Sequence, residues 1–187
     1  MNLPNKLTVL RMVIVPFFVF FLLADFIGYN GLIALVLFVF ASLTDLIDGK
    51  IARKHNLITN FGKFLDPLAD KALVISALIC FVELGFTQSW VVIIIIMREL
   101  LVTSLRLLAN GKDSSVIAAG FSGKVKTTVQ MVAISLILLF NAFNFTIGEG
   151  FPSILIGNIL MYIACAITIY SGIEYLFKYR SYIDFKN

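Results

Sequence analysis

Residues 32–51 read LIALVLFVFASLTDLIDGKI, an apolar run that ends on two carboxylates, Asp45 and Asp48. About 20 predominantly apolar residues are what a helix needs to cross a bilayer. The whole chain has this character: 60% of its 187 residues are hydrophobic and 14% are charged, against about 45–50% and about 25% in soluble domains. This composition excludes a soluble globular enzyme and a disordered chain, and it predicts a membrane protein.

Six apolar stretches of spanning length follow one another with short polar connections between them. We therefore expect an all-α, polytopic membrane protein with six transmembrane helices, formed by a single domain over residues 1–187. The expected spans are Leu7 to Ile27, Leu32 to Ile51, Leu65 to Phe86, Trp90 to Leu108, Val125 to Phe145 and Ser153 to Phe177.

Positive charge is distributed unevenly over the connections. Lys and Arg gather at the N-terminus, in the second and fourth connections and at the C-terminus, whereas the first, third and fifth connections contain none. The positive-inside rule then predicts that both termini are cytoplasmic. We expect the protein to lie in the cell membrane with its active site facing the cytoplasm. Arg98 is the exception, near the middle of the fourth span, and we expect it to form a structural ion pair with Glu99 or a neighbouring carboxylate. Because no basic stripe is present, no nucleic-acid partner is expected.

Four carboxylates border or enter the hydrocarbon between the second and third spans: Asp45, Asp48, Asp66 and Asp70. An Asp at the centre of a span costs about 2.5–3.5 kcal/mol on insertion scales, and less toward an interface, so a compensating partner is expected. Clustered carboxylate oxygens suit hard divalent cations, and no His or Cys lies near enough to favour zinc. Two Mg²⁺ or Mn²⁺ ions would balance four carboxylates, as in two-metal phosphoryl chemistry.

Helical spacing groups these acids into two stripes. On one helix, two acids share a face with two small residues: Asp45, Asp48, Gly49 and Ala52. On the next, a spacing of four aligns Gly62, Asp66 and Asp70. A helical hairpin would bring the two stripes together near the cytoplasmic side. Pro67 leaves two possibilities for the third helix, which either begins there with Asp66 as its N-cap or begins earlier and is kinked.

Two non-catalytic interpretations of the acidic residues are alternatives to a metal-dependent catalytic site. The carboxylates could form a buried ion-pair network with Arg53, Lys63 and Lys71 in a structural scaffold, or carry ions in a cation transporter. A transporter would place its acids near the midplane, between inverted repeats. The acids here lie at one interface, and no internal repeat is visible.

The spacing Asp45-x2-Asp48-Gly49-x2-Ala52-Arg53-x8-Gly62-x3-Asp66-x3-Asp70 resembles the signature of the CDP-alcohol phosphatidyltransferases at all eight positions. The resemblance implies a six-helix membrane enzyme. In its reaction an alcohol attacks the diacylglycerol-linked phosphate of a CDP-activated lipid and expels CMP, assisted by two divalent ions.

The resemblance also implies a role for each motif residue. The metal ligands would be Asp45, Asp48, Asp66 and Asp70, with Asp70 also the general base for the attacking hydroxyl. The nucleotide of CDP-diacylglycerol would lie against Thr8, Asp48, Gly49, Ala52, Arg53 and Gly62. Arg53 would contact its phosphates with a planar fork of donors.

Softer matches point to the phosphatidylglycerophosphate synthase branch of that family. They are NLPNKLTVLR at residues 2–11, FGKFLDPLADK at residues 61–71, the Arg98-Glu99 pair and GKVKT at residues 123–127. The acceptor that this branch implies is sn-glycerol 3-phosphate; inositol phosphate, serine and phosphatidylglycerol are the alternatives. Homodimers are common in the resembled family, so we expect one here. Ala164, Thr168 and Gly172 form a small-residue stripe that could pack within the chain or between two copies.

An anionic acceptor is also favoured by basic residues at the predicted cytoplasmic helix ends. We expect four of them to surround the acceptor phosphate: Arg11, Arg106, Lys124 and Lys126. Glu99 and Thr103 share a helical stripe with Arg106 and would orient its guanidinium. CDP-diacylglycerol would enter sideways from the surrounding membrane lipids, and its headgroup would meet the acceptor at the cytoplasmic side.

Overall fold

The computed structural model describes residues 2–24, 28–54, 60–112, 120–147 and 152–179. Within these ranges, side chains are described except at residues 3, 4, 46–54, 60, 61, 63, 64, 66, 67, 70, 106–112, 144–147 and 179. Over the described ranges the regular secondary structure is all helical, without strands. The helices are α1 (Leu3–Leu23), α2 (Asn30–Lys54), α3 (Asn60–Glu83), α4 (Ser89–Lys112), α5 (Phe121–Ile147) and α6 (Ser153–Tyr179).

Each expected span corresponds to one of these helices. Four of them fall wholly within their helix, whereas the first and third were expected to run on to Ile27 and Phe86, beyond the observed ends at Leu23 and Glu83. The largest difference is at the start of α3, which begins at Asn60, five residues before the expected Leu65. Of the two possibilities at Pro67, the earlier start is the one observed. Asp66 therefore lies inside the helix and does not cap it.

Among the described residues, three helices are long and apolar enough to cross a membrane, over Asn5–Leu23, Phe121–Phe143 and Ser153–Lys178. The described side chains of α2 add a shorter apolar segment, Asn30–Asp45. Large apolar side chains point outward from the bundle; Phe17 is 55% exposed, Val36 59% and Leu155 61%. Outward-facing apolar side chains of this size are suited to contact with lipid, so the chain is a membrane protein.

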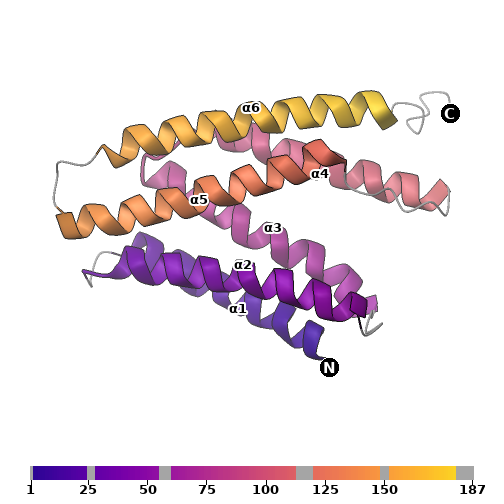
Figure 1. Ribbon diagram of the computed structural model, residues 1–187, viewed down its shortest axis with the longest axis horizontal. Coiled ribbons are helices and arrows are strands. Elements are labelled where there is room, and N and C mark those ends of the chain that lie inside the picture. The colour runs from indigo at the N-terminus through magenta and orange to yellow at the C-terminus, as the bar shows by residue number, and fades with distance from the viewer. Residues whose placement is uncertain (1, 25–27, 55–59, 113–119, 148–151, 180–187) are drawn as a thin grey trace.

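The helices run back and forth along the long axis of the bundle, with α3 crossing it diagonally (Figure 1). The start of α1, the end of α2, the start of α3, the end of α4, the start of α5 and the end of α6 all lie toward the right of this view. The opposite ends of these helices lie toward the left. The segments rich in Lys and Arg therefore share one end of the bundle.

The core is formed where α1 packs against α2 and α3, and where α5 packs against α2 and α6. Phe18 of α1 and Phe38 of α2 are fully buried, with ring centroids 5.8 Å apart. At Gly31 the backbones of α2 and α5 approach closely, since a Cβ there would lie 3.1 Å from the Ala142 Cα. A side chain at residue 31 would push the two helices apart.

The small-residue stripe of α6 packs inside the chain. Ala164 is 2% exposed, Thr168 is fully buried, and a Cβ at Gly172 would lie 3.1 Å from the Arg98 Cγ of α4. Of the two roles left open for this stripe, the structure shows the one within the chain. The small residues let α4 and α6 approach and admit the long side chain of Arg98 between them.

Candidate functional site

A buried ion pair joins α1 to α2 at the first residue of the acidic motif. Arg11 is 1% exposed, and its Nη1 lies 2.6 Å from Oδ1 of Asp45, whose side chain is 37% exposed. A buried guanidinium is tolerated in an apolar helix when a carboxylate compensates it. Arg11, expected beside the acceptor phosphate, thus contacts the first acid of the motif.

Polar residues form a stripe along the inward face of α1. Asn5 is 7% exposed and Thr8 is 1% exposed, and with Arg11 they recur every third residue. Thr8 and Arg11 were predicted as site residues from the sequence, whereas Asn5 was not. The spacing of three residues could have identified Asn5, because polar residues that recur on one face of an apolar helix indicate that this face contacts other polar groups.

The rest of the acidic motif lies on two helices joined by a short connection. α2 extends to Lys54 and α3 begins at Asn60, so every motif position is helical, as the stripes require. Gly62 is buried. The other motif side chains lie outside the described residues: Asp48, Gly49, Ala52, Arg53, Asp66 and Asp70. Their convergence with Asp45 stays a prediction.

The described side chains contain no group of three His, Cys, Asp or Glu residues that could hold a metal ion. Of the four predicted ligands, only the carboxylate of Asp45 is described. It is a hard oxygen donor of the kind that Mg²⁺ and Mn²⁺ take, and it faces a pocket. The described part of the site therefore offers one oxygen donor of the right kind, and binding of a metal ion stays a prediction.

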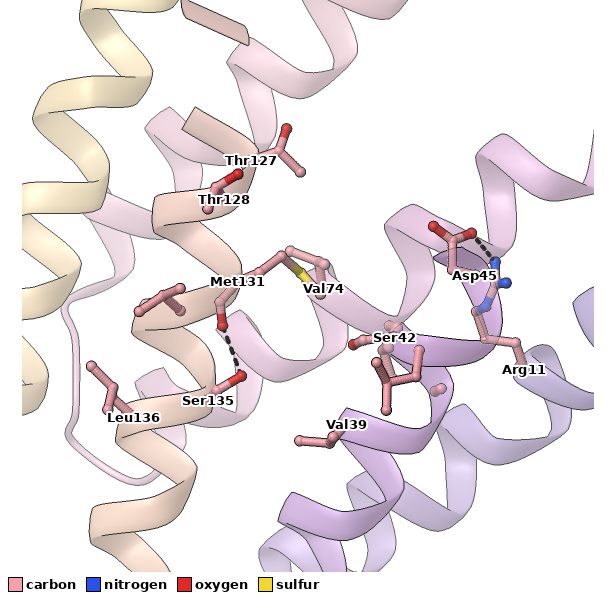
Figure 2. Close-up of a pocket in the computed structure, with 14 residues that line it drawn as sticks. Arg11, Val39, Ser42, Asp45, Val74, Thr127, Thr128, Met131, Ser135 and Leu136 are labelled. Atoms are coloured by element: carbon pink, nitrogen blue, oxygen red, sulfur yellow. Dashed lines mark hydrogen bonds and ion pairs between the residues drawn. The ribbon is translucent and has the colours of Figure 1, made fainter. Parts of the chain in front are cut away.

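This pocket, the larger of two adjoining cavities, has a volume of about 490 Å³ and lies between α2, α3 and α5 (Figure 2). Arg11 and Asp45 form one side of it, and α5 forms the opposite side. The lining is otherwise mostly apolar: Val39, Ala41, Ser42, Leu43, Leu73, Val74, Thr127, Thr128, Met131, Val132, Ser135 and Leu136. A charged end on an apolar chamber suits an amphipathic ligand.

The same pocket reaches the outer, apolar surface of the bundle. Val39 is 38% exposed, Leu43 51% and Val132 52%, and all three line it. These side chains offer an acyl chain apolar contacts on both α2 and α5, beside the polar groups of Ser42, Thr128 and Ser135. The geometry therefore allows a lipid to enter from the side.

A polar network centred on Glu99 ties α4 to α5 and α6. The Glu99 carboxylate forms ion pairs with Lys126 of α5 and, at 3.1 Å, with Nη1 of Arg98. Arg98 also donates through Nη2 to the Ser171 Oγ at 2.6 Å and lies over the ring of Tyr175. The expected pair between Arg98 and Glu99 is confirmed.

Lys71 connects this network to α3, because its Nζ donates a hydrogen bond to the Thr103 hydroxyl. That hydroxyl in turn donates to the backbone carbonyl oxygen of Glu99 at 2.7 Å. Lys71 follows Asp70 directly in the chain. The network therefore holds α3 beside α4 close to the position of the expected general base.

The four basic residues expected at the acceptor phosphate lie in different surroundings. Arg11 contacts Asp45, and Lys126 is 3% exposed and paired with Glu99. Lys124 is exposed at the start of α5, and the side chain of Arg106 is outside the described residues. Lys126, expected beside the acceptor phosphate, is thus buried against the Glu99 carboxylate.

The smaller cavity, of about 50 Å³, lies next to the pocket of Figure 2 and shares Val74, Thr127 and Met131 with it. Its polar lining comes from Lys71, Glu99, Lys126, Thr127 and Gln130. Sequence reasoning missed Gln130, a single amide in an apolar helix. The smaller cavity, which is lined by two Lys residues, therefore lies beside the larger pocket, which combines charged and apolar residues.

Comparison with known proteins gives consistent results. The family model described as CDP-alcohol phosphatidyltransferase matches residues 1–170. A Bacillus subtilis protein named CDP-diacylglycerol--glycerol-3-phosphate 3-phosphatidyltransferase is 43% identical, with 95% of this chain and 94% of the relative covered. A protein of the same name from Pectobacterium atrosepticum is 40% identical, with 94% of this chain and 93% of the relative covered. Another from Rickettsia felis is 38% identical, with 97% of each chain covered.

Proposed function

The chain belongs to the CDP-alcohol phosphatidyltransferase family, and we propose that it transfers the phosphatidyl group of CDP-diacylglycerol to sn-glycerol 3-phosphate. The products are phosphatidylglycerophosphate and CMP. The observation that carries this proposal is the pair of adjoining cavities, one amphipathic with Asp45 at its charged side and one lined by Lys71 and Lys126. They suit a lipid donor and an anionic acceptor that meet at one place.

The lipid donor occupies the larger pocket in this proposal. Its acyl chains lie along the apolar wall and extend between α2 and α5 into the bilayer, where the lining residues are exposed. Its cytidine diphosphate lies toward the acidic motif. The nucleotide contacts there are the ones that the family resemblance implies: Thr8, Asp48, Gly49, Ala52, Arg53 and Gly62. Burial of Thr8 on the inward face of α1 supports this arrangement.

Two divalent cations, Mg²⁺ or Mn²⁺, are the cofactors that we infer. Asp45, Asp48, Asp66 and Asp70 would hold them. When bound, such ions neutralise phosphate charge and hold the attacking and leaving oxygens of an in-line displacement. Arg11 keeps the Asp45 carboxylate oriented at the edge of the pocket.

The acceptor is activated by proton transfer. Asp70 takes the proton of the 1-hydroxyl of glycerol 3-phosphate, whose oxygen forms a bond to the phosphorus that carries diacylglycerol. The bond from that phosphorus to the bridging oxygen breaks, and CMP leaves. Arg11, Arg106, Lys124 and Lys126 are the residues expected to attract the acceptor phosphate. Of these, Lys126 lines the smaller cavity, where a bound phosphate would hold the hydroxyl in line with the phosphorus.

For the whole chain we propose a single catalytic domain with six transmembrane helices, both termini in the cytoplasm and the site facing the cytoplasm across the cell membrane. The shared end of the basic segments in Figure 1 supports this orientation. A homodimer stays a proposal based on the family resemblance alone. The α6 stripe does not support it, because its small residues are used within the chain.

Purified protein supplied with CDP-diacylglycerol and Mg²⁺ should release CMP when sn-glycerol 3-phosphate is added. We expect at least about 100-fold slower release with inositol phosphate, serine or phosphatidylglycerol, because a site built for one polar acceptor leaves buried groups unpaired with another. Release is measured separately for each alcohol and corrected for hydrolysis without acceptor. Faster CMP release with another alcohol would identify that alcohol as the acceptor and leave the proposed type of reaction unchanged. No release with any alcohol would contradict the proposed reaction.

Removal of divalent cations should abolish CMP release, because the motif carboxylates would then repel the diphosphate of the donor. The test is dialysis against EDTA followed by addition of Mg²⁺, Mn²⁺ or Ca²⁺. We expect Mg²⁺ or Mn²⁺ to restore turnover. Full activity after exhaustive chelation would exclude the cations as cofactors.

A further inference from the structure

Gln130 of α5 is a buried amide that points to a ligand. It is 3% exposed and lines the smaller cavity, and its Nε2 has no hydrogen-bond partner among the described residues. An unsatisfied buried donor costs about 1–3 kcal/mol, so such groups are normally paired. An acceptor atom that enters the cavity would satisfy it.

The charges around Gln130 select the kind of acceptor atom. The described cavity lining contains two ammonium groups, Lys71 and Lys126, and one carboxylate, Glu99, which sum to one positive charge. Thr103 and Glu99 hold the two ammonium groups in place. An oxygen that carries negative charge would balance the cavity and accept from the amide at the same time.

The size of the cavity limits what can enter. At about 50 Å³ it has room for about four water-sized groups, since one water needs about 10–15 Å³ by this measure. A phosphate group meets this limit, whereas a nucleotide or a lipid headgroup does not. The lining shared with the larger pocket lets the rest of a small molecule extend toward Asp45.

We propose that Gln130 is a specificity-determining residue, whose Nε2 donates a hydrogen bond to a phosphate oxygen of the acceptor alcohol. Through this hydrogen bond the amide recognises the phosphorylated end of the acceptor. The site therefore prefers an anionic alcohol to a neutral one. This inference rests on the proposed function, since it assigns a further contact to the same acceptor.

Two variants of Gln130 test this contact. Gln130→Leu removes the donor at similar size, and Gln130→Glu replaces the amide by a carboxylate that repels phosphate. The KM for sn-glycerol 3-phosphate should rise about 10-fold in the first variant and further in the second. The KM for CDP-diacylglycerol should stay within about 2-fold, because its contacts lie in the other pocket. Calorimetric titration of the same acceptor into each variant should show the same loss of affinity.

Gln88→Glu is the matched control. Gln88 is exposed before α4, where its Oε1 accepts from the Trp90 Nε1, and a carboxylate can keep that bond. An unchanged acceptor KM in both Gln130 variants would overturn the inference and leave the amide bound to water. An equal rise in both KM values, or a lowered melting temperature in both variants, would overturn it in favour of a structural role. Failure of the wild-type protein to use sn-glycerol 3-phosphate would instead contradict the proposed function.

Discussion

Replacement of Asp70 by Asn should lower the rate of CMP release by at least about 10³-fold, because Asn can neither take the proton of the attacking hydroxyl nor supply a charged metal ligand. The substitution preserves size and removes one charge, so the helix should form normally. Turnover is measured with both substrates saturating and with excess Mg²⁺. Melting of the purified variant in detergent shows whether it is folded.

Glu83→Gln on the same helix is the matched control for Asp70. Glu83 is exposed at the end of α3 away from the acidic motif, and its loss should leave turnover unchanged. A folded Asp70→Asn variant with near-normal turnover would reject Asp70 as the base. A variant that fails to fold would show that the residue stabilises the hairpin.

Replacement of Glu99 by Ala should lower the free energy of unfolding by about 3 kcal/mol, because buried cations would lose their carboxylate. Lys126 is 3% exposed and the Arg98 side chain is 11% exposed, and both pair with Glu99. Helices α4, α5 and α6 meet at this point, so the loss should loosen their packing. Denaturation in mixed micelles measures the change.

Two further variants isolate the charge effect at Glu99. Glu174→Ala removes an exposed carboxylate from α6 and should change the free energy of unfolding by less than about 0.5 kcal/mol. The double variant Glu99→Ala, Lys126→Met should recover part of the lost stability, since the buried ammonium is gone as well. If the double variant is no more stable than Glu99→Ala alone, the network is not held together by charge.

The helices could be predicted because each depends on local composition. A run of apolar residues long enough to cross the bilayer must form a helix to satisfy its backbone in lipid, whatever its neighbours are. Only the start of α3 was left open. Pro67 and Asp66 carry a local preference for a helix start, whereas the helix begins at Asn60. There the conformation of the longer segment prevailed over the preference of two residues.

The site was predictable in part. The acidic motif was found because carboxylates are costly in a membrane and because their spacing matches a known signature. Arg98 and Glu99 were paired correctly because they are neighbours in the chain. Gln130 was missed because one amide in an apolar helix gives no periodic signal, and only its place beside Lys71 and Lys126 makes it conspicuous.

The sequence by itself determined the membrane class, the helices, the acidic motif and the family, because each is written in local composition or spacing. The tertiary structure decided which distant charges meet: Arg11 with Asp45 across α1 and α2, and Lys126 with Glu99 across α4 and α5. Helix rotation and packing set these pairs, and neither is a property of any single segment. Burial then distinguishes Lys124, which is exposed, from Lys126, which is buried against the Glu99 carboxylate.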